Sequence, residues 1–118
     1  MKNYFKETET ECNCGCGSNN VSKVLMKRLN AAREKAGVPF SITSGVRCAE
    51  WNEHEGGSET SSHLTGYAVD IAVTSSYNRE RILNGLISAG FTRIGIANTF
   101  IHVDVDPKKS PNVCWLYS

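Results

Sequence analysis

The sequence predicts an α+β fold, with two to three helices and a small antiparallel sheet, because stretches of helical and of strand periodicity alternate along a short chain. The chain has 118 residues, of which 40% are hydrophobic and 21% charged, and this composition is typical of a folded globular protein with one core. We therefore expect a single domain over residues 1–118, in which residues 1–20 form a cysteine-rich N-terminal segment.

Three segments have the patterns of helices. Between residues 21 and 36, apolar side chains recur at helical spacing after Asn20, a residue type that favours the N-cap. Residues 77–89 repeat the pattern and are followed by Gly90, which is typical of a helix end. Residues 49–55 predict a brief third helix.

Strands are predicted at residues 40–43, 66–73, 93–97 and 100–105, and the last two are separated by a tight turn at residues 98–99. Because these strands are short and the chain shows no internal repeat, they are expected to form one small sheet.

Alternation along the last strand separates its polar and apolar residues. A period of two places His102 and Asp104 on one side and Ile101, Val103 and Val105 on the other. The apolar set is expected to enter the core, and the polar pair is expected to face a cleft.

Charge and hydropathy argue against two kinds of partner, nucleic acids and membranes. The formal net charge is +1, and the 13 lysines and arginines are scattered rather than clustered, which argues against a nucleic acid. No run of 18 apolar residues is present, so membrane insertion is not expected. The first residues lack the apolar region of a secretory signal.

Two histidines and one carboxylate predict a metal site. His63 and Asp70 are close in sequence, and His102 lies on the last strand. Imidazole and carboxylate are ligands that Zn²⁺ accepts, and three protein ligands with an open fourth position are typical of catalytic zinc. The expected cofactor is therefore Zn²⁺.

The run Ser61-Ser62-His63-Leu64-Thr65-Gly66-Tyr67-Ala68-Val69-Asp70 fits the pattern Ser-x-His-x-x-Gly-x-Ala-x-Asp. It resembles the first metal motif of the zinc D-Ala-D-Ala carboxypeptidase and dipeptidase superfamily, which includes phage endolysins and the Hedgehog fold. Ser44-Gly45-Val46-Arg47-Cys48, then Asn52, Gly56-Gly57 and Phe100-Ile101-His102-Val103-Asp104, resemble the short carboxypeptidase-like form in order and spacing.

The resemblance implies a Hedgehog-type zinc peptidase fold and an enzyme that cuts a peptide bond in peptidoglycan stem peptides. The cut would be that of a D,D-carboxypeptidase or of an endolysin-type endopeptidase. The expected partner is this peptide substrate, the chain is expected to be a monomer, and a phage or prophage protein that is made in the cytoplasm and acts on the cell wall fits the absence of a signal.

Two residues near the metal motif are candidates for substrate binding. Arg47 ends a predicted strand, where its guanidinium would bind a substrate carboxylate or the oxyanion, or else form a structural salt bridge. Ser61 would hydrogen-bond substrate or cap the loop before His63.

The general base departs from the family pattern. Many relatives have an acid three residues before the second zinc histidine, but this chain has Thr99 there. Asp104 shares the predicted face of His102, so it would either accept the proton or orient His102. The sequence leaves both roles open, and Asp106 and the glutamates Glu50, Glu53 and Glu55 are further candidates.

Other aromatic residues and His54 have simpler interpretations. Trp51, Trp115 and Tyr117 are expected to pack in the core. His54 lies between two glutamates and is expected at the surface, not at the metal.

The chain has five cysteines, Cys12, Cys14, Cys16, Cys48 and Cys114. Pairs within a C-x-C spacing are strained, so long-range disulfides to Cys48 and Cys114 are one interpretation. A soft-metal site made of several thiolates, expected in a reducing compartment, is the other.

The sequence is therefore compatible with three classes of function. The first is a zinc peptidase acting on peptidoglycan. The second is an inactive zinc-containing binding module for the cell wall or a protein, which the Thr99 substitution favours. The third, a structural protein such as a phage assembly component, would make the metal residues coincidental.

Overall fold

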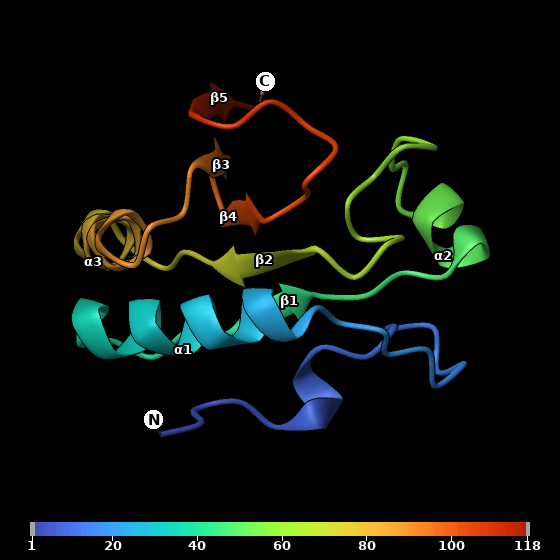
Figure 1. Cartoon of the computed structure of the whole chain (residues 1–118), viewed down its shortest axis with the longest axis horizontal. Coiled ribbons are helices and arrows are strands. Elements are labelled where there is room, and N and C mark those ends of the chain that lie inside the picture. The colour runs from blue at the N-terminus through green and yellow to red at the C-terminus, as the bar shows by residue number, and fades with distance from the viewer. Residues whose placement is uncertain (1, 118) are drawn as a thin grey trace.

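The computed structural model describes residues 2–117 and has the predicted α+β architecture (Figure 1). Its helical elements are a short 3₁₀ turn η1 (Glu7–Glu9), α1 (Lys23–Ala36), α2 (Ala49–His54) and α3 (Ser76–Ser88). Its strands are β1 (Ile42–Ser44), β2 (Ala68–Ala72), β3 (Arg93–Ile96), β4 (Phe100–Asp104) and β5 (Val113–Leu116).

The strands form one sheet in the order β1-β2-β4-β3-β5. All neighbours are antiparallel except β3 and β5, which are parallel. The expected sheet was therefore incomplete, because β5 was not predicted and makes the sheet mixed. An edge strand of four residues, of which three are exposed, has too little apolar alternation to be recognised from sequence.

The core lies between one face of the sheet and the two longer helices. Figure 1 shows α1 and α3 beside one another, with α3 viewed nearly end-on. Alternate residues of the central strands face these helices and are fully or almost fully buried. The core includes Leu25, Leu29, Ile82 and Leu86 from the helices and Val69, Ile71, Ile94, Ile101 and Val103 from the strands.

The predicted cap of α1 was wrong by two residues. Ser22 is the N-cap, because its Oγ accepts a hydrogen bond from the Leu25 N–H at 3.2 Å. Asn20 instead lies in the irregular segment before α1 that packs on Gly66, where an added Cβ would collide with the Asn20 carbonyl. Gly66 also has a φ of +78°, so this position favours glycine for two independent reasons.

The opposite face of the sheet is not covered by α1 or α3, and it carries the polar residues of the central strands. This arrangement leaves a rigid, hydrogen-bonded surface on which side chains from several strands meet. No helix within residues 2–117 is long and apolar enough to cross a membrane.

Candidate metal centre

A single row of residues crosses all the strands on the open face of the sheet. Asp70 of β2 is paired with His102 of β4, and His102 is paired in turn with Gly95 of β3. Ser44 of β1 and Trp115 of β5 extend the row at its two ends. Because directly opposite side chains are close in an antiparallel pair, the register alone brings Asp70 and His102 together.

His63 reaches the row from the loop before β2. Its ring Nδ1 lies 2.7 Å from the Gly45 carbonyl oxygen, so Nδ1 carries the proton and donates to it. This leaves Nε2 with a lone pair, 3.3 Å from Asp70 Oδ1. The backbone N–H of His63 donates to Ser61 Oγ at 3.2 Å, which fixes the turn from which the ring projects.

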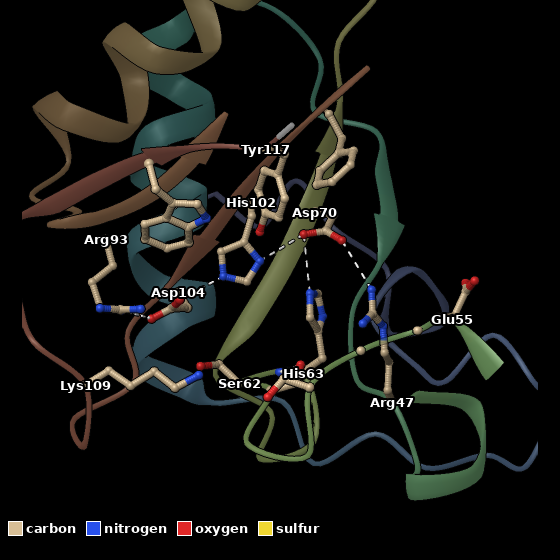
Figure 2. Close-up of a pocket in the computed structure, with 16 residues that line it drawn as sticks. Arg47, Glu55, Ser62, His63, Asp70, Arg93, His102, Asp104, Lys109 and Tyr117 are labelled. Carbon is tan, nitrogen blue, oxygen red and sulfur yellow. Dashed lines mark hydrogen bonds and ion pairs between the residues drawn. The ribbon is translucent and has the colours of Figure 1, made fainter. Parts of the chain in front are cut away.

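The three predicted ligands converge in the structure. One donor atom from each of His63, Asp70 and His102 lies within 4.8 Å of the other two, and the three residues are 3%, 7% and 8% exposed. His102 Nδ1 is 3.0 Å from Asp70 Oδ1. Ligands of a tetrahedral zinc ion are about 3.3–3.6 Å apart, so this donor set and its spacing fit zinc. Figure 2 shows the three side chains pointing toward one another.

The outer oxygen of Asp70 is held by Arg47. Arg47 Nη2 lies 3.4 Å from Asp70 Oδ2, and Arg47 Nε donates to Ser44 Oγ at 3.0 Å. Nη1 donates to Asn52 Oδ1 at 3.3 Å. The structural salt bridge considered for Arg47 is therefore present, and it leaves Oδ1 of Asp70 directed at the two histidines.

Asp104 lies on the far side of His102. Its Oδ2 is 2.7 Å from His102 Nε2, and its Oδ1 accepts hydrogen bonds from Arg93 Nε at 2.7 Å and from the Asp106 N–H at 3.2 Å. Both carboxylate oxygens are thus occupied, and Asp104 is 2% exposed. A carboxylate on Nε2 favours a proton on that nitrogen, so that Nδ1 is the ring nitrogen that faces Asp70 and would bind a metal.

The charges of the cluster reinforce one another. Burial would raise the pKa of Asp70, but the contacts of its carboxylate with the His102 and His63 rings lower it well below its ordinary value. Burial likewise favours neutral Asp104, but the bonds from His102 and the Asp106 N–H lower its pKa. His102 lies between the two carboxylates, which raise its pKa despite burial.

A cleft of about 370 Å³ opens in front of the three residues. Arg47 and Ser61, the two residues predicted to bind substrate, line it together with Glu55; Figure 2 labels Arg47 and Glu55. Thr99 does not line the cleft and is exposed in the turn between β3 and β4. His54 is exposed, as expected, and its ring stacks on Trp51 at 4.7 Å.

The assignment of Trp115 and Tyr117 to the core was wrong, because both line the cleft. The Trp115 ring lies 5.5 Å from the His102 ring, and Tyr117 lies 5.2 Å from Phe100, another cleft residue. Burial raises the pKa of the Tyr117 phenol above its ordinary value.

Gly95 is a feature of the sequence that could have predicted the position of the Trp115 ring. A Cβ on Gly95 would come within 2.5 Å of Trp115 Nε1, so only glycine lets the indole cross β3. Glycine inside a predicted strand often marks such a close approach. No role for Arg93 was predicted from the sequence. Arg93 begins the strand that pairs with β4, and this position is consistent with its ion pair to Asp104.

Comparison with known families agrees with this geometry. Residues 3–104 match the model of the family described as Peptidase M15. The chain belongs to the peptidase M15 family. This family is of the zinc D-Ala-D-Ala carboxypeptidase type, as the sequence motifs predicted. No curated protein matches the chain.

The membership accounts for the shared features of fold and site. An α+β chain with a mostly antiparallel sheet is compatible with the M15 fold, and M15 peptidases are zinc-dependent hydrolases. His63, Asp70 and His102 are the candidate ligands for that zinc in this M15 chain.

Removal of one histidine should empty this centre. We expect His63→Ala and His102→Ala each to lose about one equivalent of zinc per chain, because two remaining ligands hold the ion poorly. Elemental analysis of protein purified without added metal measures this loss. His54→Ala is the matched control, since His54 is exposed and outside the cluster. Full zinc content in both variants would show that the ligands are elsewhere.

Zinc binding at the centre should strengthen as the pH rises. The pKa of His102 is raised above its ordinary value of about 6.5, so in the metal-free chain a proton competes with zinc for Nδ1. The raised pKa of His102 also stabilises the metal-free fold. This contribution is complete at a pH below the pKa of His102 in the unfolded chain, and it is lost as the pH rises through the pKa of His102 in the folded chain. Calorimetric titration with zinc in buffers of different ionisation enthalpy measures the protons released. Binding that is independent of pH and releases no proton would contradict this assignment.

Proposed function

We propose that this M15 chain is a zinc peptidase that hydrolyses a peptide bond in the stem peptides of bacterial peptidoglycan. The observation that carries the proposal is the convergence of His63, Asp70 and His102 at the base of an open cleft. A purely structural zinc site would be closed by a fourth protein ligand. Here the described residues provide three, and the fourth direction faces space for a substrate.

The chain's own residues would prepare the site and hold the substrate. Bound zinc would supply a polarised scissile carbonyl and a water acidic enough to attack it near neutral pH. Gly45 and Asp104 hold the two imidazoles in the tautomers that ligation requires. Arg47 has more N–H donors than its three contacts use, so it can also bind an oxyanion or a substrate carboxylate.

The walls of the cleft suit a peptide that carries a carboxylate. One side presents the aromatic rings of Phe100, Trp115 and Tyr117, which give apolar contact area. Arg47 and Lys109 add positive charge around the opening. The choice of D-amino acid stem peptides rests on the family resemblance. It is compatible with the charge of the cleft, because D-Ala-D-Ala peptides end in a carboxylate that positive side chains would attract.

We assign Asp104 to positioning and Glu55 to proton transfer. A general base must accept a proton from the reacting water, and Asp104 has both oxygens occupied and its pKa lowered. Asp70 is a candidate zinc ligand, so its carboxylate would not be available as the base. Glu55 is the remaining carboxylate among the described residues that line the cleft, and it extends from the end of α2 beside Arg47.

Purified cell wall incubated with the zinc-loaded protein should release new amino groups without new reducing sugar ends. Hydrolysis of an amide produces an amine, whereas glycoside cleavage requires a pair of carboxylic acids placed around a sugar. Mass spectrometry of the fragments would identify the bond. Release of terminal D-Ala alone indicates a carboxypeptidase, and release of larger peptides indicates an endopeptidase.

The control for this digestion is the His63→Ala variant, which should release nothing. Reducing ends without amines would refute the peptidase assignment. Zinc-loaded protein that binds walls of several chemotypes but cuts none would indicate instead the binding module that Thr99 suggests.

Substitutions at Glu55 and Asp104 should separate the two carboxylate roles. Glu55→Gln should reduce turnover by about 10²–10⁴-fold while zinc content stays unchanged, because a general base is removed. Asp104→Asn should weaken zinc affinity or activity by about 10–100-fold, because His102 loses the partner that orients it. Parallel assays of hydrolysis and zinc affinity measure both effects.

Glu53→Gln is the matched control for Glu55, since it lies on α2, is exposed and does not line the cleft. Full activity of Glu55→Gln together with full zinc affinity and no turnover in Asp104→Asn would reverse the two assignments.

A further inference from the structure

A second cluster of potential ligands lies outside the cleft. The sulfur atoms of four cysteines, Cys12, Cys14, Cys16 and Cys48, all lie within 4.8 Å of one another. Three of them come from the loop between η1 and α1, and Cys48 is the N-cap residue of α2. The fold therefore brings together cysteines that are more than 30 positions apart, as in the contact between Cys14 and Cys48.

Of the two interpretations of the cysteines, the structure does not favour long-range pairing with Cys114. Cys114 is exposed on β5 at the edge of the sheet and does not belong to the cluster. The other four cysteines lie close enough to one another to form a site without Cys114.

The separations of the sulfur atoms match a single metal ion. Cys14 Sγ lies 3.4 Å from Cys12 Sγ and 3.7 Å from Cys48 Sγ. Four sulfurs around one zinc ion, with zinc–sulfur bonds of about 2.3 Å, lie about 3.8 Å apart. One sulfur can form a disulfide with only one partner, whereas a central ion contacts all of them. The close spacing also disfavours an iron–sulfur cluster, whose several irons would separate the sulfurs further.

Backbone N–H groups support negative charge on these sulfurs. The Cys48 N–H lies 3.4 Å from Cys12 Sγ, and the Trp51 N–H lies 3.4 Å from Cys48 Sγ. Hydrogen bonds of this kind stabilise thiolates, which are the form of cysteine that binds metal. Gly15 and Gly17 have φ values of +87° and +83°, so the loop can turn tightly enough to present three sulfurs on one side.

We propose that Cys12, Cys14, Cys16 and Cys48 bind a structural zinc ion, separate from the ion proposed for the histidine centre. Zinc takes four thiolates in closed tetrahedral sites, and such a site leaves no position for substrate. The ion would fasten the N-terminal loop to the start of α2. Because Cys48 follows Arg47 directly, it would also fix the backbone that carries the Arg47 guanidinium to Asp70.

Zinc content of matched variants tests the proposal. Protein purified under reducing conditions without added metal should hold about two zinc ions per chain, one for each ligand set. Cys14→Ser and Cys48→Ser should each lose one equivalent, and a His63→Ala/His102→Ala double variant should keep one. Cys114→Ser, which changes an exposed cysteine outside the cluster, should lose none.

A second measurement uses the unaltered chain, in case a cysteine variant does not fold. Iodoacetamide should modify Cys114 at once, but the four cluster cysteines only after a chelator removes the metal. Burial cannot give this protection to Cys14 and Cys16, because both are exposed. Cobalt in place of zinc in the histidine double variant should give thiolate-to-cobalt charge-transfer absorption.

The proposal would be overturned by any of three results. These are unchanged zinc content in folded Cys14→Ser and Cys48→Ser, protection that a reductant but not a chelator removes, and iron in place of zinc at the cysteines. Loss of zinc from the histidine variants alone leaves this conclusion untouched, so the two metal assignments fail independently.

Discussion

The pairing of β2 with β4 is the constraint on which the rest of the site depends, because it places Asp70 directly opposite His102. A shift of the register by one residue would turn one of these side chains toward α1 and α3, and it would expose Ile71 or Val103. Burial of the apolar face therefore fixes the register, and the register fixes the polar face. The same apolar residues that stabilise the core determine that a carboxylate and an imidazole meet on the other side.

Each candidate ligand is oriented by a partner on its second polar atom. Gly45 holds His63, Asp104 holds His102 and Arg47 holds Asp70. The partners come from different elements, so the donor atoms converge before any metal binds. Such preorganisation lowers the cost of ordering the site. The carboxylates of Asp70 and Asp104 raise the pKa of His102, so we expect a proton and zinc to compete for its Nδ1.

The segment from residue 44 to residue 48 connects the two proposed metal sites. Ser44 pairs with β2, the Gly45 carbonyl orients His63, Arg47 binds Asp70 and Cys48 joins the cysteine cluster. A segment of five residues thus includes contacts to each centre, and Val46 within it is buried and donates its N–H to the Thr10 carbonyl. A structural ion at the cysteines would therefore be linked to the histidine centre by only a few residues of backbone.

Sequence alone predicted the α+β class, the two longer helices and four of the strands, because periodicity is a local property. It also predicted His63, Asp70 and His102 as metal ligands, because their motifs resemble those of a known family. Tertiary structure decided what depends on contacts between distant segments. Only the fold shows that β5 brings Trp115 across Gly95 to His102, that Arg93 and His102 occupy both oxygens of Asp104, and that Cys48 rather than Cys114 joins the N-terminal cysteines. The physical reason is that a side chain's partners are set by which strands and loops pack together, and one sequence without its packing does not specify them.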